Sequence, residues 1–101
     1  MALTLPQLQT LIRDTYGAKD GRRGVEGTFM WFMEEVGELS AELRGTDKLA
    51  LAAEFADVLA WLATLANIAS VDLDAAIQAK YGDGCPGCGQ SPCGCSSSEK
   101  P

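Results

Sequence analysis

The sequence predicts an all-α fold, and three observations support this class. Apolar residues recur three or four positions apart, the spacing of one helix face, instead of alternating as in a strand. Glycine and proline fall mostly at the junctions between these apolar segments. No run of alternating β-branched residues is present. We therefore expect a four-helix bundle over residues 1–82, followed by a short cysteine-rich tail over residues 83–101.

Each expected helix begins at a side chain that can cap it. The first opens at Thr4, with Pro6 in its first turn, and ends near Gly17. A glycine-rich loop, AKDGRRGVEG, is expected to follow over residues 18–27. The remaining helices are expected to be capped by Thr28, by Asp47, and by Ser70 or Asp72, and to end near Arg44, Ile68 and Tyr81.

The size of the chain limits its hydrophobic core. With 101 residues, of which 47% are hydrophobic, the chain suits one domain. A domain of this size buries only a modest share of its surface. We therefore expect extra stabilisation from association with another subunit or from a covalent or metal cross-link.

Charge and hydropathy argue against two classes of partner. Eight Lys and Arg residues against 14 Asp and Glu residues give a net charge of −6, which disfavours nucleic acid. The longest apolar run, residues 49–66, approaches the length of a membrane span, but Glu54 and Asp57 inside it would be costly in lipid. The N-terminus lacks the pattern of a secretory signal, so a cytoplasmic location is expected.

Two pairs of carboxylates lie at helical spacing on the second and third expected helices. Glu35 and Glu38 are about one turn apart in the stretch EEVGE, and Glu54 and Asp57 interrupt a helix that is otherwise apolar. Such a helix is normally buried, and buried carboxylates are costly unless they are paired, protonated or bound to a metal. Because the connection between the helices is short, an antiparallel pair can bring the four carboxylates together.

Four carboxylates without histidine or thiolate suit a hard divalent cation, Mg²⁺ or Mn²⁺, better than zinc. Such a cation would attract phosphate. An alternative for Glu54 and Asp57 is a salt bridge between subunits to Arg22 or Arg23. A solvated face is the alternative for the acidic residues of the second helix.

The stretches EVGE at residues 35–38 and EFAD at residues 54–57 resemble the ExxE and ExxD signature of the MazG-like all-α nucleoside triphosphate pyrophosphohydrolases. The likeness extends over about residues 24–81. It implies a homodimer or homotetramer that cleaves a nucleoside triphosphate into the monophosphate and pyrophosphate, a reaction of nucleotide-pool housekeeping. It also implies that Glu35, Glu38, Glu54 and Asp57 are catalytic Mg²⁺ ligands, one of which can orient the attacking water.

The resemblance implies further contacts to the substrate. Trp61, one turn after the second signature, resembles the aromatic residue that such enzymes place against the base or sugar, although a core position is the alternative. Lys80 stands where relatives often carry a phosphate-binding lysine, and its alternative role is to complement a helix C-terminus. Glu34 is either the base that activates water or a solvated neighbour. Arg22 and Arg23 either contact phosphate or lie in a solvated loop.

All four cysteines lie in the tail, as a CxxC followed by a CxC at Cys85, Cys88, Cys93 and Cys95. Four thiols so close together, with glycine and proline for tight turns, predict a structural zinc site without an open coordination position. The CxC pair must bend sharply to place both sulfurs on one ion. An iron-bearing or labile site and oxidised or metal-free thiols therefore remain as alternatives.

Two other functions agree with the same pattern. One is a non-catalytic helical module that binds a nucleotide or a protein partner. The other is a dimerisation domain whose carboxylates form salt bridges between chains. The response to Mg²⁺ separates the dimerisation domain from the enzyme. The enzyme predicts tighter nucleotide binding and a higher melting temperature when Mg²⁺ is added, whereas the dimerisation domain predicts no effect of Mg²⁺ on stability.

Overall fold

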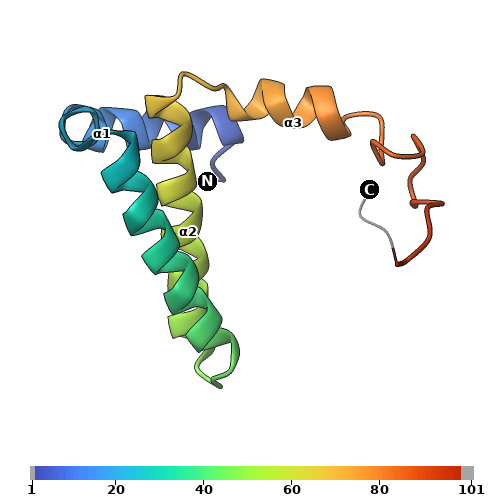
Figure 1. Ribbon diagram of the computed structural model, residues 1–101, viewed down its shortest axis with the longest axis horizontal. Helices are drawn as coiled ribbons and strands as arrows, with labels where there is room; N and C mark the ends of the chain where they lie inside the picture. Colours follow the sequence, from blue (N-terminus) through green and yellow to red (C-terminus); the bar gives the residue numbers. More distant parts are fainter. Residues whose placement is uncertain (1, 99–101) are drawn as a thin grey trace.

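The computed structural model describes residues 2–98 and contains three helices, α1 (Leu5–Leu43), α2 (Lys48–Ile68) and α3 (Leu73–Tyr81). The second half of α1 and α2 lie side by side and antiparallel, and the first half of α1 crosses one end of this pair (Figure 1). Helix α3 extends away from the pair (Figure 1). The all-α prediction is confirmed for the described residues, whereas the fourth helix and the closed bundle are not.

The three helix starts follow from local side-chain chemistry. Thr4 and Gln7 form a capping box, in which the Thr4 hydroxyl accepts from the Gln7 N–H at 3.3 Å and the Gln7 side chain accepts from the Thr4 N–H at 2.8 Å. The carboxylates of Asp47 and Asp72 accept from first-turn N–H groups of α2 and α3 at 3.0–3.1 Å. These caps agree with the prediction, and Asp72 rather than Ser70 begins the last helix.

The predicted loop over residues 18–27 is wrong, because α1 continues through it with a bend. The bend lies at Gly24, whose φ of 83° and ψ of 173° are non-helical. Thr28 does not cap a separate helix, since its hydroxyl donates to the Gly24 carbonyl at 2.7 Å. A glycine inside a helix costs only about 1 kcal/mol relative to alanine. The glycines at positions 17 and 21 therefore do not end the helix, and the ion pair between Asp20 and Arg23, three residues apart, favours its continuation.

Replacing Gly24 with alanine is expected to lower the free energy of unfolding by about 1–3 kcal/mol, because its backbone conformation is nearly closed to residues with a Cβ atom. Gly21 is the matched control, since a Cβ atom there would meet nothing within 4 Å. Gly21→Ala is expected to raise stability by roughly 0.5–1 kcal/mol. Urea unfolding of both variants gives the comparison. Equal changes in the free energy of unfolding for the two variants would contradict a non-helical conformation at Gly24.

The single chain buries little apolar surface. Among the described residues, the buried apolar side chains are Ile12, Ala63 and Ala66. Large side chains such as Phe55 and Leu59 of α2 remain exposed. By length and composition alone, α2 could cross a membrane, with a mean hydropathy of 1.7. The absence of a membrane partner therefore stays a prediction, and the apolar face of α2 is left uncovered in one chain.

The tail after α3 has no helix or strand in the residues that the structure describes, which end at Ser98. It consists of turns at the far end of α3 from the helix pair (Figure 1). The last three residues of the predicted tail, 99–101, lie outside the described part of the chain. The tail is thus separated in space from the acidic residues of α1 and α2.

Candidate functional site

Three of the four predicted carboxylate ligands converge between α1 and α2. Glu35 and Glu38 project from the second half of α1 and Glu54 from α2, and each has a carboxylate oxygen within 4.8 Å of the others. Glu35 and Glu54 are half-buried, and Glu38 is exposed. We call these three residues the carboxylate trio. The antiparallel pairing of the two helices is what brings its members together (Figure 1).

The carboxylate trio contains oxygens that lack partners. Oε2 of Glu35 and Oε2 of Glu54 are buried without a hydrogen bond. Both ion pairs found among residues 2–98 involve other carboxylates. A buried carboxylate oxygen without a hydrogen bond or a cation is unfavourable. The oxygen donors and their burial therefore fit a divalent cation such as Mg²⁺ or Mn²⁺.

The carboxylates oppose one another's ionisation. The pKa of Glu35 is raised from 4.5 to about 7 by burial and by the negative charges of Glu38, Asp57 and Glu54. The pKa of Glu54 is also raised, first by burial and then by the charges of Glu38 and Asp57. A cation bound here would favour the ionised forms, so metal binding should release protons.

In the absence of divalent metal, stability is expected to fall as pH rises from about 4.5 to about 7 because of Glu35. Between these values the carboxyl group is protonated in the folded chain but ionised in the unfolded chain, so folding takes up a proton. Melting temperatures in EDTA, compared with those of Glu35→Gln, isolate this contribution from the other groups. Wild type should lose stability relative to the variant across this range. A relative gain by wild type would contradict the raised pKa.

Asp57 lies beside the carboxylate trio but lines a neighbouring pocket of about 220 Å³. The pocket forms between the first half of α1 and α2, and its walls include Tyr16, Lys19 and Trp61. The charge of Asp57 contributes to the raised pKa of Glu35, so the two groups interact. Asp57 thus joins the acidic cluster to a pocket that has an aromatic wall and a cationic side chain.

Arg23 is held against the pocket and does not extend into solvent. Its Nη1 atom donates to Oδ1 of Asp20 at 2.9 Å and to the hydroxyl of Thr28 at 3.2 Å. The guanidinium carbon lies 4.9 Å from the ring centroid of Trp61, close enough for a cation–π contact. Trp31 stacks on Trp61 with 6.4 Å between ring centroids. These contacts fix the orientation of the Trp61 ring.

Sequence reasoning missed Asp20, Thr28 and Trp31 as supports of the pocket. The three-residue spacing of Asp20 and Arg23 is the signal that could have found their ion pair. A spacing of three residues brings two side chains together only on a helix, and this segment was expected to be a loop. The solvated-loop interpretation of Arg23 is therefore wrong, because its side chain is only 19% exposed.

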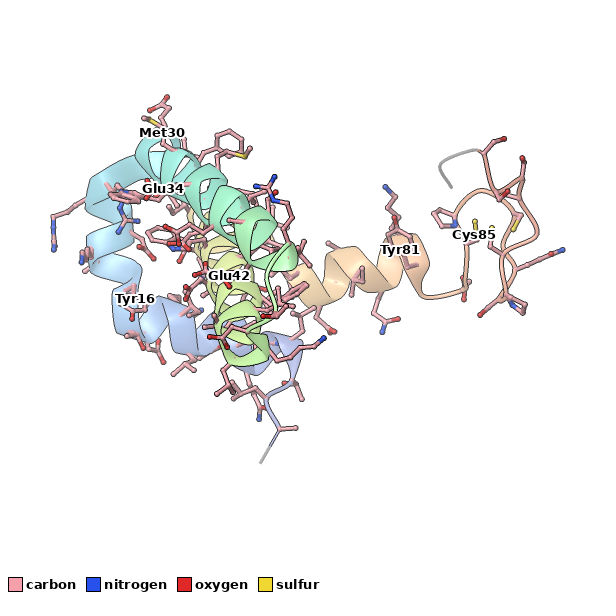
Figure 2. All side chains as sticks on the ribbon, turned by 90° about the horizontal axis from the view of Figure 1, so that it is seen from below. Tyr16, Met30, Glu34, Glu42, Tyr81 and Cys85 are labelled. Atoms are coloured by element: carbon pink, nitrogen blue, oxygen red, sulfur yellow. The ribbon has the colours of Figure 1, made fainter. Side chains whose placement is uncertain are left out.

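The remaining predicted contacts lie away from the pocket or are exposed. Lys80, in the last turn of α3, lies 5.6 Å from the ring centroid of Tyr81 and lines an apolar groove with Leu59. Figure 2 shows Tyr81 well separated from Glu34 and from the helix pair. A phosphate-binding role for Lys80 stays a prediction. Glu34 and Arg22 are exposed, which favours the solvated interpretation of both.

The four cysteines form a second cluster of metal-ligand type, in which all the sulfur atoms lie within 4.8 Å of one another. The cysteines are free thiols in the structure. Figure 2 places Cys85 beyond Tyr81, on the opposite side of α3 from the carboxylate-bearing helices. The two clusters are therefore separate sites.

Comparison with known proteins identifies the family of the helical part. Residues 23–86 match the MazG nucleotide pyrophosphohydrolase domain, a segment that includes both pairs of acidic residues and more than half of the chain. A comparison with curated proteins gave no match. Members of the matched family hydrolyse nucleotides at a phosphoanhydride bond, which agrees with an acidic cluster beside a pocket. The chain belongs to the MazG nucleotide pyrophosphohydrolase family.

Proposed function

We propose that this protein is a magnesium-dependent nucleoside triphosphate pyrophosphohydrolase. It would cleave a ribo- or deoxyribonucleoside triphosphate between the α- and β-phosphates and release the monophosphate and pyrophosphate. The observation that carries this proposal is the carboxylate trio, whose buried oxygens lack partners and which adjoins an aromatic-walled pocket. Membership of the family supports the reaction class. Removal of surplus or non-standard nucleotides is the role that this chemistry serves best.

Glu35, Glu38 and Glu54 would hold Mg²⁺, or Mn²⁺, through their clustered oxygens, and Asp57 would complete the set from the pocket side. When bound, the cation supplies charge compensation for the triphosphate and lowers the pKa of a coordinated water. An acidic protein can handle a polyanionic substrate only with such compensation. The net charge of −6 is therefore compatible with the proposed substrate.

The chain's own residues would position the two ends of the nucleotide. Asp57 interacts with the carboxylate trio and also lines the pocket, so a triphosphate held at the trio would direct its nucleoside toward that pocket. Trp61 presents an apolar surface there against which a base or sugar can pack. Arg23 and Trp31 keep that surface in place. Lys19 adds a positive charge to the same wall.

A second copy of the chain is proposed to complete the site, in a homodimer or homotetramer. The pocket of about 220 Å³ is smaller than the roughly 300–1,000 Å³ usual for small-molecule sites. The exposed side chains of Phe55, Leu59 and Leu62 would be covered by such a partner. Association would also supply the buried apolar area that the single chain lacks. Light scattering during gel filtration measures the oligomeric state.

The proposed activity is tested by incubating the protein with standard and modified nucleoside triphosphates and separating the products by ion-exchange chromatography. Equal amounts of monophosphate and pyrophosphate are expected in Mg²⁺, with no turnover in EDTA. Release of the diphosphate and orthophosphate would contradict the proposed bond cleavage. Nucleotide binding without turnover would favour a non-catalytic binding module instead.

A further inference from the structure

The sulfur atoms of the tail are spaced as ligands of one ion. The distance between Sγ atoms is 3.5 Å for Cys85 and Cys93, 3.8 Å for Cys85 and Cys95, and 4.0 Å for Cys88 and Cys93. Zinc–sulfur bonds of about 2.3 Å in a tetrahedron place neighbouring sulfurs about 3.8 Å apart. No sulfur of the four is more than 4.8 Å from another. This spacing leaves room for a single ion and not for a cluster of several.

The backbone around the cysteines stabilises negative charge on sulfur. The N–H groups of Gly87 and Gly94 donate to the sulfurs of Cys85 and Cys88, both at 3.3 Å. The N–H group of Cys95 donates to the sulfur of Cys93 at 3.2 Å. Hydrogen bonds to sulfur favour the thiolate, which is the form that binds metals. The bond from Cys95 to Cys93 closes a turn within the CxC segment, and both sulfurs of that segment lie within 3.8 Å of the Cys85 sulfur, as a shared ion requires.

The loop that carries the first two cysteines is closed by specific backbone contacts. The N–H of Cys85 donates to the Gln90 carbonyl at 3.1 Å, and the Gly89 N–H donates to the Cys85 carbonyl at 2.6 Å. Gly84 has a φ of 107°, and a Cβ atom there would lie 3.0 Å from the Gln90 carbonyl oxygen. Glycine is therefore needed at position 84 both for its backbone angle and for space.

The tail has no hydrophobic core that could hold this loop. Residues 82–98 contain no leucine, isoleucine, valine, methionine or aromatic residue. A segment of this size without apolar side chains needs another source of stability, such as disulfides or a structural metal, and its cysteines form no disulfide in the structure. The match to the MazG domain ends at residue 86, so three of the four cysteines lie beyond it.

We propose that Cys85, Cys88, Cys93 and Cys95 bind one Zn²⁺ ion as a closed site of four thiolates. Zinc suits this ligand set, because four sulfurs fill its tetrahedral coordination and leave no position for substrate. The ion links two short segments, CxxC and CxC, and fixes the tail as a compact unit. The site is structural, and its position beyond α3 separates it from the carboxylate trio (Figure 2). The proposal is independent of the proposed catalytic activity.

The metal content of the 101-residue chain, purified without chelators and measured by inductively coupled plasma mass spectrometry, tests the proposal. About one zinc ion per chain is expected, which should survive gel filtration. The double variant Cys88→Ser/Cys93→Ser should lose at least about ten-fold in zinc content, since only two ligands remain. Ser98→Ala is the matched control in the same tail and should keep its zinc. Glu38→Gln should also keep it, because that residue belongs to the other cluster.

Three further measurements use the same preparations. Thiol titration should find the cysteines unreactive until a strong chelator is added, and hydrogen exchange in residues 83–98 should become faster after chelation. Circular dichroism should show unchanged helix content in the double variant, because the tail contributes no helix. A chain that holds no metal and has freely reactive or disulfide-bonded cysteines would overturn the proposal. Iron in place of zinc, or zinc that is lost in Glu38→Gln and kept in the cysteine variant, would also overturn it.

Discussion

Replacing Glu54 with glutamine is expected to abolish Mg²⁺-dependent pyrophosphate release and, in metal-free protein at pH 8, to raise the melting temperature. Glu54 is the member of the carboxylate trio that comes from α2, and one of its oxygens is buried without a partner. Replacing a residue that only supports a metal ligand lowers metal affinity or activity about 10–100-fold. Replacing the ligand itself should therefore lower the activity more than about 100-fold. Removing the charge also removes its repulsion from Glu38 and Asp57, which raises stability.

The combination of these two effects distinguishes a metal ligand from a structural residue. A residue that supports only the fold would lose stability and activity together. Glu26→Gln is the matched control, because Glu26 is an exposed carboxylate on the same helix as Glu35. It should change neither the turnover nor the melting temperature appreciably. Turnover of the Glu54 variant close to that of wild type would exclude the trio from catalysis.

Asp20→Ala is expected to lower the free energy of unfolding by about 3–5 kcal/mol, because it leaves Arg23 partly buried without its partner. The side chains of the pair are only 5% and 19% exposed, and their atoms approach to 2.9 Å. Arg23 also contacts the ring of Trp61. The Michaelis constant for the nucleotide should therefore rise in whatever fraction remains folded. Urea unfolding and steady-state kinetics measure the two effects.

An exposed ion pair on the same helix provides the control for Asp20. Arg13 and Asp14 lie 3.6 Å apart with side chains 62% and 68% exposed, and such pairs contribute only about 0–1 kcal/mol. Asp14→Ala should therefore have little effect. The double variant Asp20→Ala/Arg23→Met should recover part of the lost stability, since no unpaired charge remains. Equal losses for Asp14→Ala and Asp20→Ala would contradict the importance of burial.

The helix starts could be predicted from the sequence because they depend on neighbouring residues alone. Thr4, Asp47 and Asp72 cap their helices through bonds to residues two or three positions away. The bend of α1 could not be predicted in the same way. Several glycines in residues 17–27 suggested a loop, but only Gly24 takes a non-helical conformation. The path there depends on tertiary packing, because Asp20 pairs with Arg23 and both line the pocket between the first half of α1 and α2.

The acidic site shows the same division between local and tertiary information. The helical spacing of Glu35 and Glu38, together with a short connection to α2, was sufficient to predict their meeting with Glu54. The different position of Asp57 was not predicted. A spacing of three residues leaves about 60° between side-chain directions, so Asp57 can line the pocket while Glu54 faces the trio. The pocket itself needs the first half of α1, whose direction depends on the bend at Gly24.

Whether the carboxylate trio holds a divalent cation is tested by titrating the protein with Mn²⁺ and following the sharp electron paramagnetic resonance signal of the free ion. With the cysteine site loaded with zinc, wild-type protein should reduce this signal, and added Mg²⁺ should restore it by competition. Glu54→Gln should leave the signal nearly unchanged, while Glu26→Gln should behave like wild type. A folded wild-type protein that leaves the Mn²⁺ signal undiminished, with and without nucleoside triphosphate, would show that the carboxylate trio holds no divalent cation.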